Sequence, residues 1–139
     1  MDCTPFFELV EELLGDAPVR PRRTEAGGQC VVDFFHPLTA ARLGDDSLVT
    51  AFNRSGVVWA PPARRLGVQL RIPDATETAV RAALEAAPFA AERTDHRGAS
   101  APDGEMVRLV HYSIRADGVA DDDLRTTLAA VAAALDVSP

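Results

Sequence analysis

Three histidines and one aspartate are the side chains of this chain best suited to acid–base or metal chemistry. Asp33 precedes His36 by three residues, and His111 lies in the middle of an apolar, strand-like run. A spacing of three places Asp33 and His36 on opposite faces of a strand, which is unfavourable for a shared metal. If the strands of His36 and His111 are adjacent, these residues form a small catalytic or metal site, and we keep that as the alternative function.

The sequence contains none of the strong catalytic or metal-binding motifs. We find no phosphate-binding glycine loop, no Gly-x-Ser-x-Gly and no Cys-x-x-Cys or His-x-x-x-His pair. We therefore expect no cofactor and favour a protein without enzymatic activity. Cys3 and Cys30 are the two cysteines. We expect free thiols, with Cys30 in the core and Cys3 accessible, and leave a disulfide open as the alternative.

Trp59 is the only tryptophan, and it precedes a rigid, arginine-bearing turn, with Pro61 and Pro62 followed by Arg64 and Arg65. Tryptophan and arginine are typical anchors of binding surfaces. A second basic cluster comprises Arg20, Arg22 and Arg23. If the two clusters converge, the surface would bind a protein partner, an acidic peptide or a small anion. The alternative is a buried Trp59 and two separate clusters, each solvated or paired with helix carboxylates.

Composition describes one acidic globular domain. The chain has 139 residues, of which 47% are hydrophobic and 25% charged, with a net charge of −7. That charge argues against nucleic-acid and anionic-membrane partners. All 14 basic residues are arginine, which suggests a GC-rich bacterial genome. The N-terminus lacks the basic start of a signal peptide and no apolar run is long enough for a membrane span, so we expect a cytoplasmic protein.

Periodicity predicts an α+β fold with a single twisted antiparallel sheet and N-terminal, middle and C-terminal helices. Helices are expected at 4–14, from Asp74 to Pro88 with an Asp74/Glu77 capping box, and after Asp121 with an apolar seam at Leu124, Leu128, Val131 and Leu135. Strands are expected at 19–24, 29–36, 56–60, 66–72, 89–94 and 106–115, with a loop at 96–104. Residues 38–55 stay ambiguous between a helix after Asp46 and a strand at 48–52.

The strand 66–72 alternates cleanly, which predicts that Val68, Leu70 and Ile72 face the core. In the strand 106–115, His111 is expected on the face opposite to Val110, Tyr112 and Ile114.

This order of elements, in a small acidic chain, resembles the type III secretion chaperone-like family. The stretch from Gly56 to Pro62 is not a diagnostic motif of that family, and the resemblance depends on element order, size and charge. The resemblance implies a dimeric, cytoplasmic binding protein without catalysis. Independently, five alanines on the last helix (Ala129, Ala130, Ala132, Ala133 and Ala134) permit close approach of a second helix, so we expect a homodimer.

Overall fold

A computed structural model describes residues 2–16, 21–43 and 54–137, and within them the chain forms an α+β domain. The sheet is antiparallel throughout, in the order β1-β2-β3-β4-β6-β5. Its strands are β1 (Arg22–Ala26), β2 (Gln29–Phe34), β3 (Ser55–Ala60), β4 (Arg65–Pro73), β5 (Glu92–Ser100) and β6 (Met106–Ala116). The helices are α1 (Thr4–Leu14), α2 (Pro37–Leu43), α4 (Glu77–Leu84) and α5 (Asp121–Leu135). The predicted fold class is confirmed.

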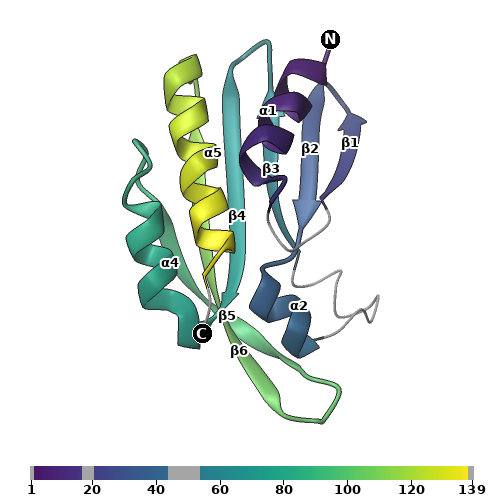
Figure 1. Cartoon of the computed structure of the whole chain (residues 1–139), viewed down its shortest axis with the longest axis vertical. Coiled ribbons are helices and arrows are strands. Elements are labelled where there is room, and N and C mark those ends of the chain that lie inside the picture. Colours follow the sequence, from purple (N-terminus) through teal and green to yellow (C-terminus); the bar gives the residue numbers. More distant parts are fainter. Residues whose placement is uncertain (1, 17–20, 44–53, 138–139) are drawn as a thin grey trace.

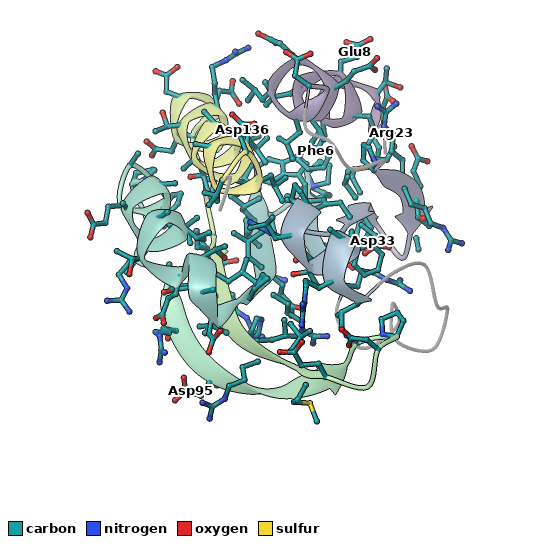
Figure 2. All side chains as sticks on the ribbon, turned by 60° about the horizontal axis from the view of Figure 1, so that its bottom comes forward. Phe6, Glu8, Arg23, Asp33, Asp95 and Asp136 are labelled. Atoms are coloured by element: carbon teal, nitrogen blue, oxygen red, sulfur yellow. A yellow bond between two sulfur atoms is a disulfide. The ribbon has the colours of Figure 1, made fainter. Side chains whose placement is uncertain are left out.

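Helices α1 and α5 lie side by side over one face of the sheet, with α4 next to α5 (Figure 1). Figure 2 shows Phe6 pointing from α1 into the space between this helix layer and the sheet. The predicted seam of α5 is buried there, as are the alternate residues Leu66, Val68, Leu70 and Ile72 of β4. None of the helices in the described residues has the length and apolar character that a membrane crossing requires.

The hairpins follow from the alternation in the sequence. Strands β3 and β4 pair with Val57 opposite Val68, and β4 then pairs with β6, with Leu70 opposite Tyr112. These side chains lie on the face that the helices cover, so successive residues such as Gln69 and Arg71 lie on the other face. That other face carries no α1, α4 or α5 across the middle of β3, β4 and β6 (Figure 1).

Several predicted boundaries differ from the structure. Strand β5 begins at Glu92 and continues to Ser100, through part of the predicted 96–104 loop, because β6 pairs with it along this length. Helix α2 occupies 37–43, whereas the predicted helix after Asp46 and its alternative strand lie outside the described residues. The predicted capping box is also wrong: Asp74–Thr76 form a 3₁₀ turn without a side-chain cap.

The expectation of two free thiols is wrong as well. Cys3 and Cys30 form a disulfide, and both residues are fully buried. Cys3 is the N-cap residue of α1 and Cys30 lies on the helix-covered face of β2. Sequence spacing could not show that α1 folds back to place its first turn over this strand. The disulfide therefore attaches the N-terminal helix to the sheet.

Candidate functional site

Trp59 lies in the core and not on a surface. Its side chain is 5% exposed, and the ring of Phe6 stacks on it with centroids 6.2 Å apart. The Arg64 guanidinium lies 5.2 Å from the Trp59 ring centre, a cation–π contact. Trp59 thus packs α1 and the β3–β4 turn together and presents no exposed aromatic anchor.

The two predicted arginine clusters do not converge. Arg64 pairs with Asp121, Arg65 pairs with Asp117 at 2.6 Å, and Arg23 pairs with Glu11 at 3.4 Å. The register places Arg22 level with Gln69 of β4, three strands away, and Arg65 is four residues farther along β4. Arg22 and Arg65 are thus about 19 Å apart in the sheet. Arg20 lies outside the described residues.

The histidines and Asp33 are not brought together either. His36 is fully buried: Leu38 N–H donates to its Nδ1 at 3.2 Å, so its Nε2–H donates to the carbonyl of Ala134 at 3.1 Å. Burial lowers the pKa of His36, which keeps the ring neutral. Strands β3 and β4 separate Asp33 on β2 from His111 on β6. Within 2–16, 21–43 and 54–137, no three side chains of His, Cys, Asp or Glu are grouped as a metal site would require.

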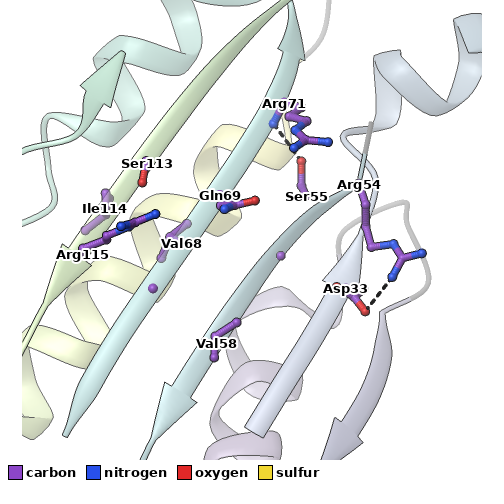
Figure 3. Close-up of a pocket in the computed structure, with 12 residues that line it drawn as sticks. Asp33, Arg54, Ser55, Val58, Val68, Gln69, Arg71, Ser113, Ile114 and Arg115 are labelled. Carbon is purple, nitrogen blue, oxygen red and sulfur yellow. Dashed lines mark hydrogen bonds and ion pairs between the residues drawn. The ribbon is translucent and has the colours of Figure 1, made fainter. Parts of the chain in front are cut away.

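The side chains that do converge line the open face of the sheet. A hollow of about 360 Å³ lies over β3, β4 and β6 (Figure 3). A second hollow of about 560 Å³ adjoins it and shares Val58, Gly67 and Arg115 with it. Among the residues that line the two hollows, the charged ones are Arg54, Arg65, Arg71, Arg115, Asp33 and Asp117. We call this surface the arginine face.

Two of these arginines form ion pairs with aspartates of the same surface. Arg54 pairs with Asp33 at 3.4 Å, as the dashed line in Figure 3 shows, and Arg65 pairs with Asp117. Arg71 and Arg115, in contrast, form no ion pair with any carboxylate in the described part of the chain. The arginine face therefore carries positive charge that no carboxylate of the described residues compensates.

The main chain of Arg71 is fixed by two hydrogen bonds with neighbouring side chains. Its backbone N–H donates to Ser55 Oγ at 2.9 Å, and its carbonyl accepts from Thr39 Oγ1 at 3.4 Å. Its Nε is buried and has no hydrogen-bond partner among the described residues. Burial lowers the pKa of Arg71, although a guanidinium stays charged. A half-buried arginine that lines a hollow and has no ion-pair partner in the described residues is suited to bind a carboxylate or phosphate there.

Two glycines form the floor of the arginine face, and only one is required by the fold. A Cβ on Gly56 would lie 3.1 Å from the carbonyl oxygen of Val32 and 3.2 Å from Asp33 Oδ1. A Cβ on Gly67 would meet nothing nearer than the Val58 side chain at 3.9 Å. Glycine weakens a central strand, and it often marks a place where a ligand approaches the backbone. Gly67 fits that description because the fold itself leaves room for a side chain.

The sequence predicts the facing of the site residues on each strand, but not which strands are neighbours. The alternation of 66–72 assigns Gln69 and Arg71 to the face opposite Leu70, and the alternation of 106–115 does the same for Arg115. Alternation does not show which strands are neighbours. In the sheet β6 lies next to β4, although β5 comes between them in the sequence. Without that pairing, Arg71 and Arg115 are not neighbours.

Comparison with known proteins adds no relative: no family model, no curated protein and no solved structure matches this chain.

Proposed function

We propose that this protein is a binding module, with no catalytic step of its own, whose arginine face holds an acidic segment of a protein partner. The observation that carries the proposal is the pair Arg71 and Arg115, which border a hollow and have no carboxylate partner in the described residues. Carboxylates from a partner would supply what these guanidinium groups lack. Because Gly67 has no side chain, the main chain of a bound partner can approach the sheet at this position.

The distribution of charge supports an acidic polypeptide as the ligand. The chain carries −7 overall, and the exposed sides of α1 and α5 present Glu8, Glu11, Asp121 and Asp122. An acidic partner is repelled by the helix layer and attracted to the arginine face, which gives one preferred docking side. A nucleic acid, with its dense and regular charge, would be repelled by most of the molecule.

Three further expectations belong to this proposal. The order of elements supports a chaperone-like module similar to the type III secretion chaperone-like family. A homodimer and a cytoplasmic location follow from the same resemblance. The Cys3–Cys30 disulfide argues against the cytoplasmic location, because such bonds are rare in a reducing cytosol and common outside it.

The test is the binding of a fluorescently labelled, glutamate-rich peptide followed by anisotropy. Binding should weaken as salt rises, because exposed charge pairs are screened. Arg71→Ala and Arg115→Ala should each weaken binding by about tenfold, the loss expected for one charge-assisted hydrogen bond.

The matched control is Arg125→Ala on α5, since Arg125 pairs with Glu12 on the helix side of the molecule. This variant should bind as the parent does. Equal losses in all three variants would show a general charge effect and contradict the proposal. A glutamine-rich peptide of the same length should not bind, and an oligonucleotide that bound better than the peptide would also overturn it.

A further inference from the structure

Resting on that proposed function, we infer that the bound segment is extended and carries two carboxylates four residues apart, one for Arg71 and one for Arg115. The ladder of the sheet fixes the places of these two arginines. Arg71 of β4 is opposite His111 of β6, and Gly67 is opposite Arg115. Arg71 and Arg115 therefore differ by four residues along the strand direction, which corresponds to about 13 Å.

An extended peptide that lies along the strands matches this separation. Its side chains alternate between its two faces, so residues i, i+2 and i+4 point to the sheet and i and i+4 are about 13 Å apart. A helical peptide does not match it, because residues four apart are only about 6 Å apart along the axis.

The surface between the two arginines suits the middle residue of such a segment. Residue i+2 would lie over the row formed by Gly56, Gln69 and Ser113, which the register places side by side. Figure 3 shows Gln69 and Ser113 on neighbouring strands along this row. Gln69 and Ser113 offer hydrogen bonds to this residue.

Gly67 gives the second carboxylate access to Arg115. It lies beside Arg115 in the ladder, and among the described residues other than its chain neighbours, Val58 has the only side chain within 4 Å of the position that a Cβ would take. A side chain at position 67 would occupy the space through which a carboxylate reaches that guanidinium. The fold tolerates a side chain there, so Gly67→Val changes the site without straining the backbone.

The experiment compares two blocked, threonine-rich peptides, each with two glutamates, placed four residues apart in one and three apart in the other. The peptides have the same composition and charge, so simple attraction binds them equally. In an extended chain a spacing of three puts the glutamates on opposite faces. We expect the four-residue spacing to bind about tenfold more tightly, the value of one additional charge-assisted contact.

Two variants test whether Arg115 and Gly67 cause the preference for the four-residue spacing. Arg115→Ala and Gly67→Val should each reduce the four-spaced peptide to the affinity of the three-spaced one, while circular dichroism confirms the native fold. Equal binding of the two peptides, weakened for both by Arg71→Ala, would overturn this inference and leave the proposed function standing. Equal binding with no loss in Arg71→Ala, or no binding by either peptide, would overturn both.

Discussion

Glu77 connects three elements through one carboxylate. It accepts hydrogen bonds from Arg81 on its own helix at 2.6 Å, from Tyr112 on β6 at 3.1 Å and from Arg93 on β5. The bond from Arg93, assisted by those from Arg81 and Tyr112, lowers the pKa of Glu77 to about 2. The ionised carboxylate therefore stabilises the attachment of α4 to the edge of the sheet.

The first prediction follows from that pKa. A carboxyl whose folded pKa lies below its unfolded value of 4.5 stabilises the fold above pH 4.5, and this contribution disappears as the pH falls toward about 2. Glu77→Gln should thus lower the free energy of unfolding at pH 7, and the difference from the parent should shrink between pH 4.5 and 2. Urea unfolding across this range measures it.

Glu85→Gln is the control for Glu77→Gln, since it removes one exposed carboxylate at the end of the same helix. A difference between parent and Glu77→Gln that stays constant down to pH 2 would show that the Glu77 contacts do not stabilise the fold.

Leu70 supplies the second prediction, on the facing of β4. Its side chain is fully buried, so Leu70→Ala should lower the free energy of unfolding by ~2–5 kcal/mol. Replacing its exposed neighbour Gln69 by alanine should lower the free energy of unfolding by less than about 0.5 kcal/mol. A loss below about 1 kcal/mol for Leu70→Ala would mean that the strand faces the other way, because a one-residue slip exchanges the two faces.

At the scale of elements, local periodicity in the sequence predicted which faces of the strands and helices are buried. The alternation of Val68, Leu70 and Ile72 and the seam of α5 identified the covered faces correctly. Strand β5 was predicted too early and too short, at 89–94, because Glu92–Ser100 has no apolar alternation and becomes a strand through its pairing with β6. The arginine face was missed for a related reason: it depends on which strands are neighbours and on which side the helices pack.

The third prediction concerns the attachment of α1. The Cys3–Cys30 disulfide closes a loop with a sequence separation of 27, and a loop of that length predicts a stabilisation of ~2–4 kcal/mol. The double variant Cys3→Ala/Cys30→Ala should lose that amount of unfolding free energy, as measured in urea, and adding reductant to the parent should have a similar effect.

Reductant should leave the double variant unchanged, which is the control for its other effects. Thiol titration of the denatured parent without reductant should find no free thiol. Two reactive thiols in that titration would contradict the disulfide.

The whole molecule is electrically two-sided. Carboxylates such as Glu8, Glu11 and Asp122 are exposed on the helix layer, and the arginine face lies on the other side of the sheet. Two copies that meet through their arginine faces would repel each other and would cover the surface proposed for an acidic partner. A homodimer that also binds the ligand must therefore use another surface, and the exposed alanines of α5 on the helix layer offer one.

The fourth prediction tests that interface. Helix α5 packs between α1 and α4, which buries Ala130 and Ala134 within the chain and leaves Ala129 and Ala133 exposed. If these two alanines form the centre of a symmetric contact, light scattering should give twice the chain mass of 14.8 kDa. Ala129→Glu should return the mass to that of one chain without unfolding it, since glutamate is a good helix former at an exposed position.

This variant should still bind acidic peptide, because position 129 is on the helix side. A parent mass of one chain at micromolar concentration would contradict the dimer and leave the arginine face unaffected.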